Sequence, residues 1–270
     1  MSPASTVTAL VLAGSRRGES DPVARYRQVA AKCLATAGGV PLLLRVLRAL
    51  AASPGIGRIL VSLDDPTLLG LVPELRQPAL ADRVTVLASA PSLSRSVAEA
   101  FERAQAPLLV TTADHALLDP DMVAHLLAAA ERTGADVVFG VAAAATIRAG
   151  YPDTRRTYLR FRDGGYSGAN LFLLRTAAAA RAIDFWRRIE RDRKAPWRLA
   201  RAFGPVLLAA YLLRVATLAQ AMALVSRRLG IRVAAIVMPT AEAAIDVDKP
   251  ADLDLVESIL ARRDGQEAGA

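Results

Sequence analysis

The chain has 270 residues, 53% of them hydrophobic and 5% aromatic, and a formal net charge of +8. This length allows a large buried core, and the single cysteine, Cys33, excludes both an intrachain disulfide and a cysteine-based zinc site. The first apolar run is short and lacks a basic leader, so we expect no signal peptide and a cytoplasmic location.

The positive charge favours an anionic partner. Few aromatic residues accompany the arginines, and the sequence has no helix-turn-helix, zinc-finger or RNA-recognition signature, so we expect no nucleic-acid partner. Phosphorylated small molecules and the anionic inner face of a membrane remain as candidate partners. The sequence leaves the oligomeric state open.

Apolar runs alternate with helical patterns through the first half of the chain. Strands are predicted at 7–12, 58–63, 83–88, 107–112 and 135–141. Helices are predicted at 41–52, 94–104 and 119–132. Because continuous apolar runs are typical of strands buried on both faces, this alternation predicts an α/β fold with a mostly parallel sheet between two layers of helices.

The second half of the chain is less regular. Its predicted strands are 157–162, 171–174 and 231–238, and a polar, glycine-rich loop is predicted at 164–170. A helical insert, both basic and apolar, is predicted at about 176–230, and a last helix is predicted to end near Ala261. We expect a single domain over residues 1–262 and a disordered tail at 263–270.

Several polar and glycine residues stand close to the ends of predicted strands. Ligands of parallel sheets bind at the carboxyl ends of the strands, so we expect Gly14, Asp64, Ser94 and Asp114 to lie along one edge. Backbone N–H groups of a glycine turn after a parallel strand can hold phosphate oxygens. The cations that follow this turn and supply the charge a polyphosphate requires are Arg16, Arg17 and Lys32.

Two segments that contain aspartate are candidates for a metal site. Asp114 follows a predicted buried strand, where a carboxylate is solvated, caps the next helix or binds Mg²⁺. Asp246 and Asp248 flank Val247, so in an extended segment their side chains point the same way. The pattern fits a Mg²⁺ site completed by one of these two acids, and it also fits a turn before the last helix.

Four stretches of the chain together resemble a known family. They are Leu12-Ala-Gly-Ser-Arg-Arg, Lys32 followed by Gly38-Gly-Val-Pro-Leu-Leu, Thr112-Ala-Asp-His-Ala-Leu-Leu, and Ile245-Asp-Val-Asp-Lys-Pro-Ala-Asp-Leu. In this order they resemble the MobA-like nucleotidyltransferases of the NTP-transferase superfamily. The resemblance implies a three-layer, Rossmann-like fold of the GT-A type. It also implies Mg²⁺-dependent transfer of a nucleoside monophosphate from CTP or GTP to a phosphorylated small-molecule or alcohol-phosphate acceptor, with release of pyrophosphate.

The resemblance further implies a role for each matching residue. The residues expected to bind the nucleotide are Leu12, Ala13, Gly14, Ser15, Ser94, Ser96 and Asp114. The cations expected to act on the phosphates in catalysis are Arg16, Arg17 and Lys32. The residues expected to contact the acceptor are Ser167, Gly168 and Asn170. The expected metal ligands are Asp114 and Asp246, with Asp248 as the alternative to Asp246.

Two departures from the family pattern bear on these roles. The loop between Gly14 and Lys32 is longer than the compact form of the family, so Arg25 or Arg27 is an alternative to the two arginines of the turn. Val40 stands where the family often has a basic residue before the proline. A charge expected at the acceptor site or at a dimer face is therefore missing.

Two other functions fit parts of the pattern. A glycosyltransferase of the same fold would use a nucleotide-sugar donor and usually an Asp-x-Asp motif, whereas this chain has Thr112-Ala-Asp-His. A non-catalytic protein that binds nucleotides or serves as a membrane adaptor would not require a phosphate-binding lysine and two acids together. The nucleotidyltransferase is therefore the preferred function.

The helical insert contains an apolar stretch, 205–225, close in length to a membrane span of roughly 20 residues. Arg214, Thr217 and Gln220 lie near its middle, and a central arginine costs about 2.5–3.5 kcal/mol on insertion scales, which argues against a span. Two core helices that meet near 216–217 fit the stretch. Peripheral binding to an anionic bilayer, or an apolar groove for a lipid-like acceptor, fits it as well.

Overall fold

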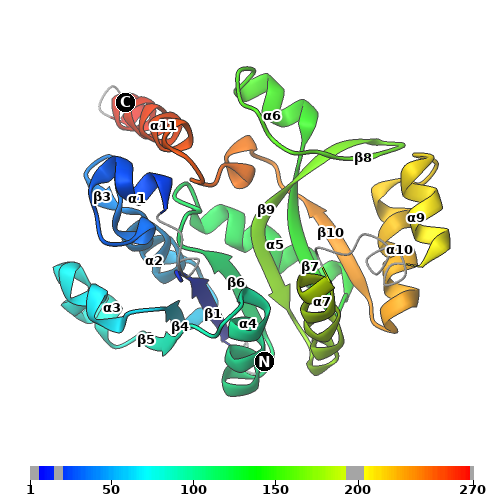
Figure 1. Cartoon of the computed structure of the whole chain (residues 1–270), viewed down its shortest axis with the longest axis horizontal. Helices are drawn as coiled ribbons and strands as arrows, with labels where there is room; N and C mark the ends of the chain where they lie inside the picture. The colour runs from blue at the N-terminus through cyan, green and yellow to red at the C-terminus, as the bar shows by residue number, and fades with distance from the viewer. Residues whose placement is uncertain (1–5, 15–20, 193–203, 268–270) are drawn as a thin grey trace. The chain divides into compact units, whose positions relative to one another are not determined.

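The computed structural model describes residues 6–14, 21–192 and 204–267, and the chain divides into two compact units. The first unit comprises 1–89, 111–123 and 245–270, and the second comprises 90–110 and 124–244. Strand β6 (Leu108–Thr112) begins in the second unit and ends in the first, and helix α5 (Pro120–Thr133) begins in the first and ends in the second. Figure 1 labels the elements of both units.

A parallel sheet forms the centre of the first unit. Strand β1 (Val7–Leu12) pairs with β4 (Ile56–Leu63), and β4 pairs with β5 (Val84–Ala88). Most residues of β1 and β4 are buried, which explains why both strands consist mainly of apolar residues and lack a regular polar alternation. Helix α2 (Leu42–Ala52) packs on β4 and contributes fully buried leucines to this core.

A short hairpin separates the first two helices of this unit. A 3₁₀ turn, η1 (Lys32–Leu34), leads into strands β2 (Thr36–Ala37) and β3 (Val40–Pro41), which pair antiparallel. Gly38 and Gly39 form the two-residue turn with φ of 54° and 72°. Positive φ at both positions is what such a hairpin requires, and it favours glycine.

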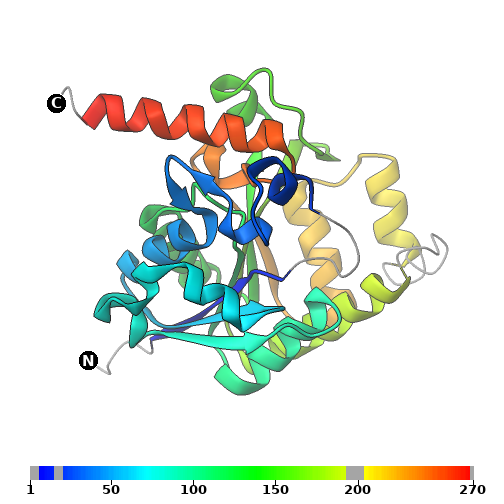
Figure 2. The same ribbon diagram turned by 60° about the vertical axis from the view of Figure 1, so that its left-hand side comes forward.

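Helix α1 (Pro22–Arg27) and the last helix, α11 (Pro250–Glu267), pack against each other in the first unit, and α11 also contacts β2 (Figures 1 and 2). An ion pair of 2.5 Å joins Arg27 to Glu257 of α11. Arg27 is therefore engaged in packing, which weakens it as an alternative phosphate-binding arginine. The remaining short elements of the unit are η2 (Pro66–Leu71), η3 (Pro73–Arg76) and α3 (Pro78–Ala81).

The second unit has a mixed sheet. Strand β10 (Val233–Val237) pairs parallel with β7 (Val137–Ala143), whose other neighbour, β9 (Gly164–Leu174), runs antiparallel (Figure 1). Strand β8 (Leu159–Phe161) pairs antiparallel with the start of β9. Among the described residues, the helices that lie wholly within this unit are α4 (Leu93–Ala104), α6 (Ala144–Gly150), α7 (Ala180–Asp192), α9 (Pro205–Leu212) and α10 (Leu218–Leu229), with 3₁₀ turns η4 (Ala177–Ala179) and η5 (Ala241–Ala244).

The alternation of strands and helices, with parallel pairs in both units, confirms the predicted α/β class. The predicted break of the helical insert is also confirmed. Helix α10 starts after Thr217, whose hydroxyl accepts a hydrogen bond from Gln220 N–H while the Gln220 side chain accepts one from Thr217 N–H. In the described part of the chain, every helix is too short or too polar to cross a lipid bilayer.

The glycine-rich segment 164–170, predicted as a loop, is instead the first half of β9. This segment pairs with a strand on each side: Ser167 lies opposite Ala142 of β7, and Tyr166 lies opposite Leu159 of β8. Glycine has a low intrinsic preference for strands, but pairing on both sides outweighs it. The prediction was wrong because it used local composition alone.

The last helix is also longer than predicted. It runs to Glu267, whereas the sequence pattern ended it near Ala261 and assigned 263–270 to a disordered tail. The extension contains Arg262, Arg263, Gln266 and Glu267, which are good helix formers, and Gly265 among them does not end the helix. Residues 268–270 lie outside the described part of the chain.

Candidate active site

The carboxyl ends of three strands meet in the first unit. Ala13 N–H donates a hydrogen bond of 2.8 Å to the carbonyl of Ser62 at the end of β4. Ala113 N–H, just after β6, donates one of 3.0 Å to the carbonyl of Leu12 at the end of β1. Gly14 and Asp114 each follow one of these bonded residues directly, so both lie at the same edge of the sheet.

Gly14 is exposed and lies close to the ends of β4 and β5. A Cβ atom added at Gly14 would lie 2.6 Å from Ser89 Oγ and 3.2 Å from Asp64 Oδ1. The Ser89 hydroxyl is also 3.1 Å from the buried Ser62 hydroxyl. A side chain at position 14 would therefore require the Ser89 side chain or the turn itself to shift. The residues that follow, including the predicted Ser15, Arg16 and Arg17, lie outside the described part of the chain.

Lys32 joins two distant acids of the first unit. Its Nζ atom donates to Asp114 Oδ2 at 2.5 Å and lies 3.5 Å from Asp248 Oδ1. The Asp114 side chain is 13% exposed and that of Asp248 is 69% exposed. The Lys32 ammonium group therefore contacts two carboxylates: that of Asp114, which follows β6 and is nearly buried, and that of Asp248, which is solvated.

Backbone and side-chain hydrogen bonds fix the two acidic segments. Val247 N–H donates to the carbonyl of Asp114 at 3.1 Å, and the Thr112 hydroxyl donates to Asp114 Oδ1 at 2.5 Å. The buried carboxylate of Asp252 accepts hydrogen bonds from Asp248 N–H at 3.2 Å and from the next backbone N–H at 3.1 Å. Asp252 thus holds the turn that carries Asp248, a role that the sequence pattern did not reveal.

Opposing effects act on the Lys32 ammonium group. Burial alone would lower the pKa of Lys32, but the charge and hydrogen bond of Asp114, together with the charges of Asp248 and Asp21, raise its pKa above the ordinary value. Lys32 is therefore cationic at neutral pH. A cationic side chain beside a glycine turn is suited to contact phosphate oxygens.

The acids suit a divalent cation that also binds a ligand. Asp114 and Asp248 already converge on one ammonium group, and Asp246, half-buried, lies on the other side of Val247. The described residues contain no cluster of three or more histidine, cysteine, aspartate or glutamate side chains that could hold a metal. Mg²⁺ usually takes one or two carboxylates and completes its shell with water and phosphate oxygens, so this donor set fits Mg²⁺ held together with a nucleotide.

His115, beside Asp114, belongs to the core. It is fully buried, and its Nδ1 atom lies 3.5 Å from the Thr111 hydroxyl. Burial lowers the pKa of His115 to about 4, although the charge of Asp114 opposes this. His115 is therefore neutral at pH 7 and is not exposed to a ligand.

The two serines expected to bind the nucleotide, Ser94 and Ser96, lie in the first turns of α4 in the second unit, and both are buried. Ser94 donates through its hydroxyl and its N–H to the Glu190 carboxylate of α7, with the N–H bond at 3.3 Å. The Ser96 hydroxyl accepts a hydrogen bond of 3.0 Å from Ala90 N–H. A carboxylate therefore occupies the donors of Ser94.

The residues expected to contact the acceptor lie on β9. Ser167 is buried, and Gly168 is exposed with no atom within 4 Å of an added Cβ. Asn170 has a positive φ of 44°, where the register between β7 and β9 shifts. Such bulges redirect side chains and are common beside functional sites, and asparagine tolerates this conformation better than most residues.

Most of the chain matches a known protein family. Residues 9–229 match the MobA-like NTP transferase domain. The chain belongs to this family. The match contains Gly14, Lys32 and Asp114, whereas Asp246 and Asp248 lie beyond it.

Individual relatives agree with this assignment. A hypothetical transferase from Thermus thermophilus is 32% identical, with a TM-score of 0.75 over 92% of this chain and 99% of that chain. The 2-C-methyl-D-erythritol 4-phosphate cytidylyltransferase of Acidobacterium capsulatum is 30% identical over 114 residues, which are 41% of this chain and 47% of the relative. The chain thus spans about half the length of this curated relative.

A more distant structure shows the fold alone. It is CMP:2-keto-3-deoxy-manno-octonic acid synthetase complexed with CTP, which is 15% identical, with a TM-score of 0.57 over 96% of this chain and all of that chain. These similarities confirm the Rossmann-like nucleotidyltransferase fold that the sequence motifs implied.

Four residues that contact the segments of the expected site residues were not predicted from the sequence: Ser62, Ser89 and Asp252 in the first unit, and Glu190 in the second. Ser89 directly follows β5, so its place after a predicted strand was a usable signal. Glu190 and Asp252 lie within helices and had no such signal. Their partners became visible only in the folded chain.

Glu190→Gln is expected to tighten NTP binding by roughly fivefold to tenfold, because a neutral amide holds Ser94 less strongly than a carboxylate and releases its donors to a nucleotide. Isothermal titration with CTP and GTP measures the change, and Glu102→Gln, at an exposed position of α4, is the control. If the affinity for the NTP is unchanged and the melting temperature is lower, the Ser94–Glu190 contact serves only to pack α4 against α7.

Cys33, next to Lys32, is expected to resist thiol reagents. It is 3% exposed, and burial raises the pKa of its thiol to about 11, so roughly one part in a thousand is thiolate at pH 8. Labelling with an aromatic disulfide at pH 8 should be at least about 100-fold slower than in urea-unfolded protein. Equal rates in the two states would show that the η1 turn opens readily.

Proposed function

We propose that this protein transfers a nucleoside monophosphate from an NTP, CTP or GTP, to a phosphorylated small molecule or an alcohol phosphate, with Mg²⁺ and with release of pyrophosphate. The observation that carries the proposal is the contact of Lys32 with both Asp114 and Asp248 beside the Gly14 turn. Membership of the MobA-like NTP transferase family supports it. CTP is favoured, because the named relatives include a cytidylyltransferase.

Each group at the strand ends has a task in this reaction. The turn that starts at Gly14 and continues with Ser15 binds the phosphates, because the Ala13 N–H already donates to Ser62 and Leu12 belongs to the buried strand β1. Ser94 and Ser96 bind the nucleoside once Ser94 exchanges its Glu190 partner for it. Lys32 moves from its carboxylate partners to the triphosphate and stabilises the charge that develops at the α-phosphorus. Arg16 and Arg17 share this task.

The metal ligands in this proposal are Asp114 and Asp248, with Asp246 as the alternative partner of Asp114. Mg²⁺, when bound, neutralises phosphate charge and orients the α-phosphate. The shared contact with Lys32 favours Asp248. Asp248→Asn should then raise the Mg²⁺ concentration needed for half-maximal rate more than Asp246→Asn does.

The reaction needs positioning more than covalent chemistry. An acceptor phosphate oxygen attacks the α-phosphorus in line, the bond from that phosphorus to the bridging oxygen breaks, and pyrophosphate leaves with the electron pair. The acceptor phosphate is ionised at neutral pH, so no side chain has to remove a proton. The proposed contacts with the acceptor are Ser167, Gly168 and Asn170 of β9. We propose the cytoplasm as the location of the protein.

A pyrophosphate-release screen tests the proposal. The full chain is incubated with Mg²⁺, each of the four NTPs and a panel of sugar phosphates and alcohol phosphates. We expect release with one or two NTPs, only when an acceptor is present, and its loss on chelation of the metal. Release of a nucleoside diphosphate from a nucleotide sugar would instead support a glycosyltransferase, and no turnover in either screen would leave a non-catalytic nucleotide-binding protein.

A further inference from the structure

Helix α9 is apolar on all sides, yet none of its residues is buried. A helix of this composition normally lies in a protein core or against lipid. Val206 and Leu212 of this helix are each 67% exposed, and the next residues continue the pattern, with Leu213 at 72% and Val215 at 55%. We call these four side chains the apolar patch.

The residues of the apolar patch lie close together in the sequence, on α9 and directly after it. Among the described residues, ten large hydrophobic side chains are exposed, and four of them fall between positions 206 and 215. The ring of Tyr211 packs edge-on against the ring of Phe161, with 5.7 Å between the ring centroids, and this contact attaches α9 to the rest of the second unit. The patch therefore belongs to a helix that is attached on one side and exposed on others.

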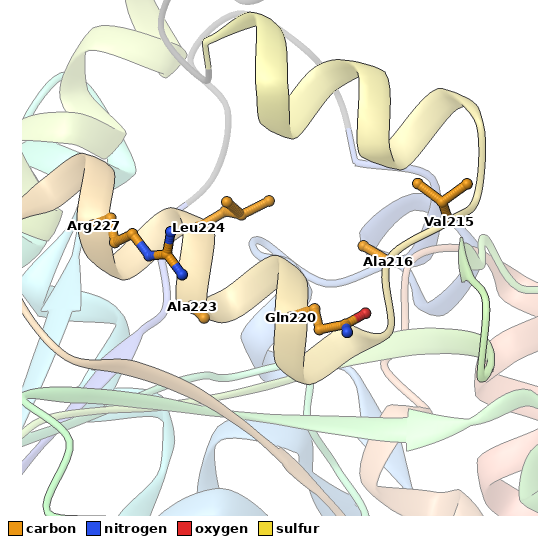
Figure 3. Close-up of a pocket in the computed structure, with 6 residues that line it drawn as sticks. All are labelled: Val215, Ala216, Gln220, Ala223, Leu224 and Arg227. Atoms are coloured by element: carbon orange, nitrogen blue, oxygen red, sulfur yellow. The ribbon is translucent and has the colours of Figure 1, made fainter.

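Only part of α9 packs on its neighbour. A pocket of about 290 Å³ lies beside α10, and Figure 3 shows Val215 and Leu224 at the space between the two helices. Its other lining residues are Ala216, Gln220, Ala223 and Arg227. Apolar surface thus continues from α9 onto α10.

The stretch of chain that carries the apolar patch contains arginines and no acid, although the Asp163 carboxylate accepts hydrogen bonds from Leu218 N–H at its edge. Between Gly204 and Ala241 the sequence contains no aspartate or glutamate, and its charged residues there are Arg214, Arg227, Arg228 and Arg232. Arg214 is exposed and lies between two patch residues, Leu213 and Val215. Exposed apolar side chains with arginines among them are the composition by which peripheral proteins bind anionic lipid.

The same charge argues against a second copy of the chain as the occupant. A two-fold contact would bring two copies of this arginine-containing stretch together, and the stretch itself supplies no acid to pair with the arginines. An anionic bilayer supplies the complementary charge and an apolar interior in one surface. We propose that the apolar patch, with Arg214 and Arg227 beside it, binds the surface of an anionic lipid bilayer, with α9 in the interface.

This docking is peripheral, and it goes beyond the proposed function. It is measured without nucleotide, so its result and that of the pyrophosphate screen are independent. The full chain is floated with vesicles of phosphatidylcholine alone and with vesicles of equal parts phosphatidylcholine and phosphatidylglycerol. We expect binding to the anionic vesicles that is at least about tenfold stronger and that falls several-fold between about 0.1 M and about 0.5 M salt.

Two variants test the residues. Leu212→Ser combined with Leu213→Ser should reduce binding to anionic vesicles by at least about tenfold, and Arg214→Ser should reduce it by about threefold or more. The matched controls are Leu71→Ser, 64% exposed in the first unit, and Arg132→Ser, exposed on α5; both should bind like the unmodified chain. Circular dichroism melting confirms that the variants are folded.

Three results would overturn the proposal. They are equal binding to neutral and anionic vesicles, unchanged binding of the double leucine variant, and no binding at low salt. Light scattering after gel filtration of the vesicle-free protein adds a fourth. If the unmodified chain is a dimer that the double leucine variant converts to a monomer, the apolar patch is an interface between copies and not a lipid-binding surface.

Discussion

Lys32→Ala and Asp114→Asn are each expected to reduce turnover by at least about 100-fold while the protein remains folded. The Lys32 ammonium group contacts both Asp114 and Asp248. Its loss would remove the positive charge that is proposed to stabilise the triphosphate. Asp114→Asn keeps the shape and the Thr112 hydrogen bond but removes the charge that a divalent cation requires. Steady-state pyrophosphate release at saturating Mg²⁺ measures both effects.

Controls separate this loss from a change in the fold. Asp82→Asn and Arg58→Ala alter exposed charges just before β5 and near the start of β4, at the opposite ends of these strands from the site, and should keep the rate of the unmodified chain. The melting temperature of Asp114→Asn should fall, because the amide loses the ion pair of this nearly buried side chain with Lys32, but unfolding should remain a single cooperative transition. A rate for either Lys32→Ala or Asp114→Asn within about threefold of the unmodified chain would remove the assignment of that residue.

Gly14→Ala is expected to lower kcat/KM for the NTP by about tenfold or more. The added Cβ would lie 2.6 Å from Ser89 Oγ, which is held near the Ser62 hydroxyl, and we expect the turn to yield and to shift the backbone that is proposed to hold the phosphates. The double variant Gly14→Ala with Ser89→Ala should recover part of the loss, because it removes the clashing oxygen. Steady-state kinetics of the two single variants and the double variant form a thermodynamic cycle.

Gly70→Ala is the matched control for this cycle. An added Cβ at Gly70 meets no atom within 4 Å, and its φ is not in the positive range, so activity should not change. Ser89→Ala alone removes the hydrogen bond to the buried Ser62 hydroxyl and should cost about 1 kcal/mol of stability with little effect on rate. A Gly14→Ala enzyme as active as the unmodified chain would show that the turn does not hold the phosphates.

Local sequence determined the strands and helices that form the centre of each unit. The run at 7–12 became β1, and 107–112 contains β6, because strands buried on both faces need continuous apolar residues. The break of the insert near 216–217 was readable for a similar reason, since Thr217 and Gln220 form a capping box that starts α10. The ordered motifs also identified the family, which the match over 9–229 confirms.

Local pattern could not assign elements whose stability comes from distant partners. The glycine-rich half of β9 is a strand because β7 and β8 pair with it, although its composition is typical of a loop. Helix α9 shows the converse: its apolar sequence fits a core position as well as a lipid-binding surface, but in the fold none of its residues is buried. Burial is set by what packs against an element, and that information is spread over the whole chain.

The sequence by itself determined the residue types at the candidate site: a glycine turn, a lysine and two acidic segments. Only the tertiary structure decided that Lys32 contacts Asp114, 82 positions away, and Asp248, 216 positions away. It also decided that His115 is buried and that Ser94 meets Glu190. The physical reason is that periodicity records which side of an element faces the core, whereas these contacts depend on how strand ends from remote segments are brought to one edge.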